Sequence, residues 1–209
     1  MSVASPFRAI RVTPYLCLAA GALLVLVPLV VEFVSGDAFA LMGLVLLLVL
    51  GALPGLRRLQ VGRDGRAGRW GQRLTFAGLA GMIAVVVSGD VLDAAMSGTA
   101  QAAAEAIWLV VAALATLGVL VGVVLFSVGM TRARVLDPRG IWIFLTGMVV
   151  GLAAESFEQS LAGPVPWLAD VLPPLGFISA GVGLFVLGRS AQAVLGEHSA
   201  SRVASPVAG

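Results

Sequence analysis

Long apolar runs alternate with short polar connections along the whole chain. Six runs each come close to the ~20 residues that an α-helix needs to cross a bilayer, and they cover residues 14–34, 38–56, 72–92, 103–130, 140–161 and 173–189. The connections carry glycines, prolines and charges, which favour helix ends. The pattern predicts an all-α, polytopic membrane protein with six transmembrane helices in three hairpins. Residues 1–199 are expected to form a single domain, and residues 200–209 a disordered tail.

The basic residues predict how these helices are oriented. The chain has 13 Lys and Arg residues, and all of them are arginines. Every arginine falls in a segment that the three hairpins leave on the same side as both termini. Because cytoplasmic segments retain positive charge, we expect both termini and the arginine-rich loops to be cytoplasmic. The expected location is therefore the plasma (cytoplasmic) membrane, crossed several times and in contact with its lipids.

Composition narrows the chemistry that is available. With 59% hydrophobic and 11% charged residues, the chain has no room for a soluble domain. We find no basic patch with interleaved aromatic residues and therefore expect no nucleic-acid partner. The absence of lysine excludes a Schiff base. The only histidine, His198, lies near the C-terminus, and the only cysteine, Cys17, lies inside the first span. Haem, zinc and Cys–His catalytic sites therefore lack their parts, and we expect neither a cofactor nor a metal.

Stripes of small residues predict which helix faces pack together, because in a bilayer they allow two backbones to approach closely. The fifth span gives the clearest stripe, with Gly147 and Gly151 one turn apart. The third and fourth spans carry similar stripes, at Gly78 and Gly81 and at Gly118 and Gly122. We expect these faces to be helix contacts.

Several carboxyl groups lie at or near the ends of such stripes and are candidate catalytic residues. They are Glu32, Asp90, Asp93, Glu155 and Glu158. Glu155 stands about fifteen residues into its span, so about 20 Å of a ~30 Å apolar core lies behind it. A charged side chain at that depth costs ~2.5 kcal/mol or more, and no arginine lies on that side. The neutral, protonated acid is therefore the expected form. The acids Asp37, Glu105 and Asp170 are expected at the surface instead.

A neutral carboxylic acid among apolar and aromatic side chains is a proton donor. The candidate substrate-binding residues near the acids are Phe33, Trp108, Phe157, Gln159, Trp167 and Phe177. The sequence therefore favours an intramembrane enzyme that admits a lipophilic small molecule from the bilayer. The acid would protonate an alkene or epoxide, and aromatic faces would stabilise the cation that results.

The chain resembles the small integral-membrane terpene cyclases of bacterial drimentine-type and fungal meroterpenoid pathways. The resemblance lies in its size, its many spans and the acids of Glu155-Ser156-Phe157-Glu158 and Asp90-Val91-Leu92-Asp93. It implies an isoprenoid or terpenoid substrate and a cyclisation that begins with protonation.

Other functions remain open at this point. The same carboxyl groups are suited to a proton-coupled transporter of small molecules or cations, which with only six helices would be expected to form a homo-oligomer. They are also suited to an all-oxygen site for Ca²⁺, Mg²⁺ or Mn²⁺, although a Mg²⁺-pyrophosphate site is disfavoured because no arginine is at hand for the phosphates. An accessory membrane subunit is the remaining alternative. The scarcity of polar side chains in the second and sixth spans argues against a polar path and so favours the enzyme.

Overall fold

The computed structural model describes residues 6–31, 38–60, 63, 65–95, 99–162 and 166–203, and these form an all-helical bundle. Its six helices are α1 (Pro6–Val31), α2 (Ala38–Arg58), α3 (Gly65–Ala95), α4 (Thr99–Ala133), α5 (Pro138–Ala162) and α6 (Pro166–Val203). Each contains one of the predicted runs or nearly all of it. The prediction of an all-α chain is therefore confirmed.

Three of the helices are long and apolar enough to cross a membrane, within the part of the chain that is described. The stretches are Ala106–Ala133 in α4, Pro138–Ser156 in α5 and Asp170–Gly196 in α6. A shorter apolar stretch, Val12–Pro28, lies in α1. These features are compatible with a membrane protein.

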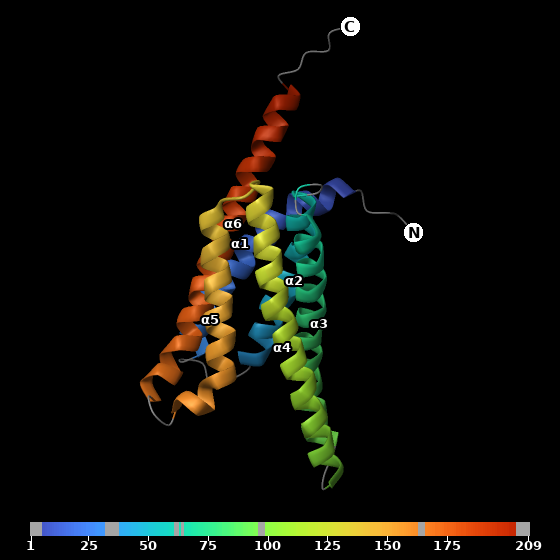
Figure 1. The fold of residues 1–209 in the computed structure, drawn as a ribbon, viewed down its shortest axis with the longest axis vertical. Helices are drawn as coiled ribbons and strands as arrows, with labels where there is room; N and C mark the ends of the chain where they lie inside the picture. The colour runs from blue at the N-terminus through green and yellow to red at the C-terminus, as the bar shows by residue number, and fades with distance from the viewer. Residues whose placement is uncertain are drawn as a thin grey trace.

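The start of α1 and the end of α6 lie at the same end of the bundle (Figure 1). The ends of α2 and α4 and the starts of α3 and α5 lie there as well. This end carries arginines such as Arg58, Arg66, Arg132 and Arg139, and we refer to it as the arginine-rich end. The last turns of α6 extend past the other helices at this end (Figure 1).

The boundaries of α6 differ from the sequence prediction. We expected a span that begins at Pro173 and a disordered tail from residue 200, whereas α6 begins at Pro166 and continues to Val203. Pro166 occupies the first helical position, where a missing N–H group costs nothing. The helix then continues through Pro173 and Pro174, which remove backbone hydrogen bonds without ending it. Residues 200–203 thus continue α6, and residues 204–209 of the expected tail lie outside the described residues.

The short connection between α4 and α5 shows why one helix ends and the next begins. Arg134 follows the last residue of α4 with a φ of 52°, the left-handed conformation that commonly ends a helix. Asp137 then accepts a hydrogen bond at Oδ1 from the backbone N–H of Arg139, at 2.9 Å. Asp137 is thus the N-cap of α5, with Pro138 in the first helical position. This agrees with the expectation that prolines and charges in the connections favour helix ends.

Close helix contacts form at the glycine stripes. A Cβ atom added to Gly147 of α5 would lie 2.2 Å from the backbone nitrogen of Ala180 in α6. One added to Gly78 of α3 would lie 2.6 Å from the backbone nitrogen of Val119 in α4. Only hydrogen fits at such positions, so these helix pairs pack backbone against backbone. The predicted packing faces of the third, fourth and fifth spans are confirmed.

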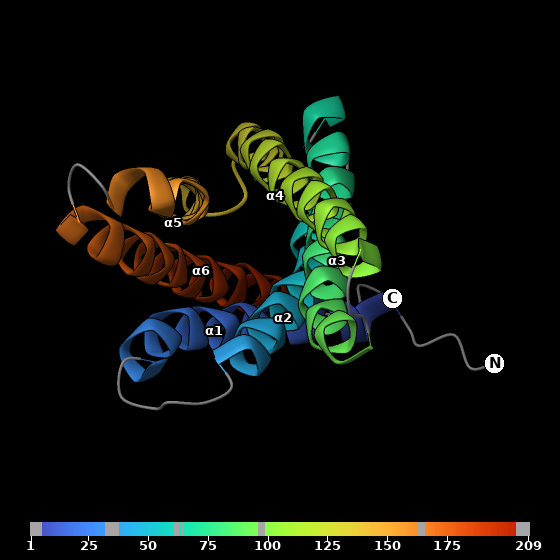
Figure 2. The same cartoon turned by 90° about the horizontal axis from the view of Figure 1, so that it is seen from below.

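The six helices form a ring of unequal contacts. The most extensive contacts join α3 to α4 and α5 to α6, and α1 also packs along α6 and α2. Contacts of α2 with α3 and of α4 with α5 are much less extensive. Figure 2 shows α5, α6, α1 and α2 following one another, with α3 and α4 as a separate pair beside them. The bundle is therefore a four-helix unit joined loosely to a helix pair, and its interior lies between the two.

Candidate functional site

A cavity of about 130 Å³ lies between the four-helix unit and the α3–α4 pair. Five of the six helices line it, and the residues are Leu24 of α1, Val45, Leu46 and Val49 of α2, Leu79 and Met82 of α3, Met148, Leu152 and Glu155 of α5, and Phe177 of α6. Nine of these ten side chains are apolar. Among the described residues, Glu155 is the single carboxyl group that borders the cavity.

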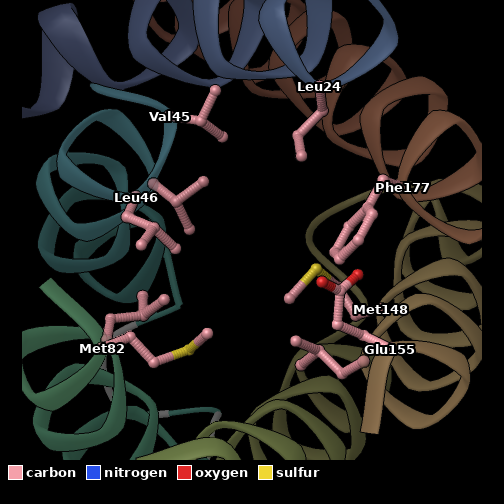
Figure 3. A pocket seen from close by; sticks show the side chains of 10 residues that line it. Leu24, Val45, Leu46, Met82, Met148, Glu155 and Phe177 are labelled. Carbon is pink, nitrogen blue, oxygen red and sulfur yellow. The ribbon is translucent and has the colours of Figure 1, made fainter. Parts of the chain in front are cut away.

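The helical register of α5 brings Glu155 to the cavity. Met148, Leu152 and Glu155 are spaced four and three residues apart, so they share one face of the helix. Figure 3 shows the carboxyl group of Glu155 projecting into the cavity beside Met148 and Phe177, with Leu46 and Met82 on the opposite wall. The glycine stripe of α5 faces α6 instead, and Glu155 lies on the neighbouring face.

Phe177 is held beside Glu155 by the same close packing. A Cβ atom added to Gly151 would lie 3.2 Å from two ring carbons of Phe177, and one added to Gly176 would lie 2.3 Å from the backbone nitrogen of Gly151. The missing side chains of these two glycines make room for the aromatic ring against α5. Glu155 and Phe177, both candidate site residues from the sequence, therefore line the same cavity.

Glu155 is less enclosed than the sequence predicts. We expected a deeply buried carboxyl group, but its side chain is exposed, whereas its neighbours Leu152 and Ala154 are buried. The reason is that the cavity leaves one side of α5 without a packing partner at this level. Glu155 thus borders the cavity from an exposed position on α5.

Two predicted aromatic residues lie away from this cavity. Trp108 is half-buried on α4, where its Nε1–H donates a hydrogen bond to the carbonyl oxygen of Val85 at 3.2 Å, and it lines a separate hollow between α3 and α4. Among the α4 side chains that the structure describes, none lines the cavity of Glu155. Trp167 is exposed in the first turn of α6 and does not line it either. Of the aromatic residues that the sequence proposes for the site, Trp108 and Trp167 therefore do not border the cavity of Glu155.

The remaining predicted site residues are not placed. Glu32 and Phe33 lie outside the described residues. Five others have helical backbones in α3 or α5 but side chains outside the described part, namely Asp90, Asp93, Phe157, Glu158 and Gln159. Asp170 is exposed, in agreement with its predicted surface position. Within the described residues, no three His, Cys, Asp or Glu side chains come together.

Buried polar atoms near the arginine-rich end were missed by the sequence analysis. Gln72 of α3 and Ser127 of α4 are almost fully buried, and the Gln72 Oε1 and Ser127 Oγ atoms have no hydrogen-bond partner among the described residues. The same holds for both amide atoms of Gln60. Gln72 lies seven residues before the buried Leu79, and Ser127 lies four residues after the buried Val123. This helical spacing is the signal in the sequence that indicates an inward orientation.

Comparison with known proteins adds no family or fold relationship. No family model, curated protein or solved structure matches the chain.

Proposed function

We propose that all six helices cross the plasma membrane, with both termini and the arginine-rich end in the cytoplasm. Three observations support this topology. Three helices are long and apolar enough to span, the helices alternate in direction (Figure 1), and exposed arginines gather at one end. Positive charge at one end of a helix bundle favours a cytoplasmic position for that end.

Within this membrane frame, we propose that the chain is an enzyme that uses Glu155 as a general acid on a lipophilic substrate. The single observation that carries the proposal is the projection of one carboxyl group into a cavity whose other nine lining side chains are apolar. A carboxylate is costly in such surroundings and inside a membrane. The neutral acid is the form expected among apolar side chains within a membrane, and a neutral carboxylic acid is a proton donor.

The size of the cavity indicates how much of a substrate would enter. Its 130 Å³ is close to the ~150 Å³ of an apolar cavity that stays dry and holds a benzene molecule. A group of about one six-membered ring fits beside Glu155. For a longer isoprenoid chain, the reacting end would occupy the cavity while the rest stayed in the bilayer.

The reaction that suits this arrangement is an isomerisation by protonation. The Glu155 O–H bond breaks as the π-electron pair of a substrate alkene forms a new C–H bond, which leaves a carbocation. A second alkene of the substrate attacks the cation and closes a ring. Loss of a proton from the cyclised cation to a carboxylate then restores the acid, so no co-reactant is consumed. The ring of Phe177 is close enough to the carboxyl group to stabilise the cation through its π face.

The experiment compares lipid extracts from cells that produce the wild-type chain, Glu155→Gln or Asp170→Asn. The Asp170→Asn variant makes the same chemical change at an exposed carboxyl group that does not line the cavity. We expect a lipid isomer with unchanged mass and altered chromatographic retention from the wild type and Asp170→Asn. Glu155→Gln should reduce it by at least ~100-fold, the usual contribution of a general acid. Equal product from Glu155→Gln, or no isomer from the wild type, would contradict the proposal.

A proton-coupled carrier is the second candidate, and the buried polar atoms of Gln72 and Ser127 favour it. They add polar groups between the cavity and the cytoplasmic end, which a proton or substrate path would need. Leu79 of α3 lies between them and the cavity and is almost fully buried, so the path would have to open at this level. Proton uptake into vesicles that depends on Glu155, without any lipid isomer, would favour the carrier over the enzyme.

A further inference from the structure

The first two turns of α3 carry a basic face with an aromatic residue among its arginines, which the sequence analysis missed and the proposed function does not use. Arg66, Arg69, Trp70 and Arg73 are spaced three, one and three residues apart, and all four side chains are exposed. This spacing puts them on one side of the helix, while Gly71 and Gln72 of the same turns are buried. We refer to these four residues as the arginine–tryptophan face.

The charges of this face are concentrated and open to a ligand. Within the described part of the chain, none of its three guanidinium groups forms an ion pair with a carboxylate. The Arg69 Nε–H donates a hydrogen bond to the carbonyl oxygen of Gly65 at 3.4 Å, which leaves the other four N–H donors of that guanidinium. Three guanidinium groups on two helical turns are suited to phosphate oxygens, which they can bind through paired hydrogen bonds.

The packing of α3 on α4 sets the level of this face along the bundle. Gly71 lies against Phe126, and Gly122 lies against Thr75, because Cβ atoms added at these glycines would be 2.2 and 2.3 Å from the facing backbone nitrogens. Arg73 therefore stands beside the part of α4 between Gly122 and Phe126. That part belongs to the apolar stretch Ala106–Ala133, so the Cα atom of Arg73 is level with a membrane-spanning segment.

The side chain of Arg73 turns back from this apolar level. Its Cζ atom lies 5.4 Å from the centroid of the Trp70 ring, which is nearly one turn closer to the arginine-rich end. Helical side chains point toward the N-terminus of their helix, and long basic side chains at membrane edges reach toward the headgroups in this way. Trp70 is an amphipathic ring of the kind enriched at that interface.

We propose that the arginine–tryptophan face binds the headgroups of anionic phospholipids in the cytoplasmic leaflet. Charge complementarity supports a phosphate-bearing partner, and the position of the face selects a lipid over a soluble polyanion. The face is continuous with Phe76, which is 43% exposed one turn further along α3. A lipid places its phosphate against the guanidinium groups and its acyl chains against Phe76, whereas a soluble polyanion has no counterpart for the apolar side chain. The inference requires the membrane placement but not the catalytic role of Glu155.

The test uses Trp70 as a local reporter. In a chain with Trp108→Phe, Trp142→Phe and Trp167→Phe, the fluorescence of Trp70 is measured in phosphatidylcholine vesicles that contain either brominated phosphatidylglycerol or brominated phosphatidylcholine. We expect phosphatidylglycerol to be preferred around Trp70, because each basic residue near the surface favours an anionic lipid by about fivefold. A variant that combines Arg66→Gln, Arg69→Gln and Arg73→Gln should lower that preference by a factor between about 5 and about 100.

A matched control removes the same charge elsewhere. Arg132→Gln, Arg139→Gln and Arg189→Gln change three exposed arginines outside the face, and this variant should keep the preference at Trp70. Equal quenching by the two brominated lipids in the parent chain, or an equal loss of preference in the control, would overturn the proposal. Binding of soluble polyphosphate to the face without a lipid preference would overturn it in favour of a soluble partner.

A second measurement tests the proposal even if the tryptophan-substituted chain does not fold. Native mass spectrometry of the otherwise unaltered chain, released from mixed vesicles, counts the phosphatidylglycerol molecules that stay bound. The wild type and Glu155→Gln should retain more of them than the variant that lacks the three arginines of the face. Equal retention by the wild type and that variant would refute lipid binding here, whereas a failure of the catalytic proposal would leave this result unchanged.

Discussion

Replacement of Gly147 by alanine should weaken the packing of α5 on α6. The added Cβ atom would lie 2.2 Å from the Ala180 nitrogen, 2.7 Å from the Gly176 carbonyl oxygen and 2.8 Å from the Ala180 Cα atom. All three are backbone atoms, so no side chain can rotate away. Because ordinary contact begins at 3.4 Å, the two helices must separate locally by about 1.2 Å.

The free energy of unfolding should fall by about 1–3 kcal/mol, the usual cost of overpacking. A gap of 0.5–1 Å already removes about a quarter to a half of the dispersion energy of a contact, and neighbouring contacts of this interface would lose a similar share. The matched control is Gly43→Ala in α2, where an added Cβ atom meets nothing within 4 Å. That variant should be unchanged or gain up to about 1 kcal/mol from the higher helix propensity of alanine.

The single thiol of the chain provides the assay. Cys17 of α1 is 0% exposed and packs against α6, where a Cβ atom added to Gly188 would lie 3.2 Å from the Cys17 Cβ atom. A maleimide should therefore react only when these helices open. In detergent with added SDS, Gly147→Ala should raise the labelling rate by about 5- to 150-fold over the wild type. Equal rates for Gly147→Ala and Gly43→Ala would refute the argument that backbone contact holds α5 on α6.

Two further predictions concern a buried hydroxyl group and the topology. Ser127→Ala should leave the chain as stable as the wild type, or up to about 1 kcal/mol more stable, because it removes a buried Oγ atom without a hydrogen-bond partner among the described residues. Thermal unfolding in detergent measures this change in stability. A loss of stability above ~1 kcal/mol would contradict the prediction and indicate a partner for Oγ. In a Cys17→Ser background, the exposed positions Arg139 and Asp170 are replaced singly by cysteine. A membrane-impermeant maleimide added to whole cells should label the cysteine at 170 and not the one at 139, and the reverse pattern would contradict the proposed orientation.

The helices and their packing faces could be predicted from local features of the sequence. Apolar runs of membrane length and glycine stripes depend on neighbouring residues, and Gly147 and Gly78 do lie in close helix contacts. The start of α6 could not be predicted in this way. The adjacent Pro173 and Pro174 indicate a helix start, but Pro166 already satisfies that rule seven residues earlier and the helix tolerates the later pair.

The composition of the cavity depends on which helices are neighbours, which the sequence does not specify. Glu155 and Phe177 come together because α5 and α6 are joined by their glycines. Trp108 is equally aromatic but belongs to α4, which lines a different hollow. Met82 and Met148 were not predicted at the site because their only signal is helical spacing, which also fits ordinary packing. Flexible methionines suit a wall that adapts to different apolar shapes.

The interfaces of α2 with α3 and of α4 with α5 are the least extensive, so the bundle can open there with the least loss of packing. Local opening follows the interfaces with the fewest contacts, so α3 and α4 would swing outward together while their glycine interface stays closed. Leu79 and Met82 would move with them, and the carboxyl group of Glu155 would remain with α5 and α6. If the bundle lies in a membrane as proposed, this opening between helices would face the lipid, and the substrate of the proposed enzyme would reach Glu155 without passing through water.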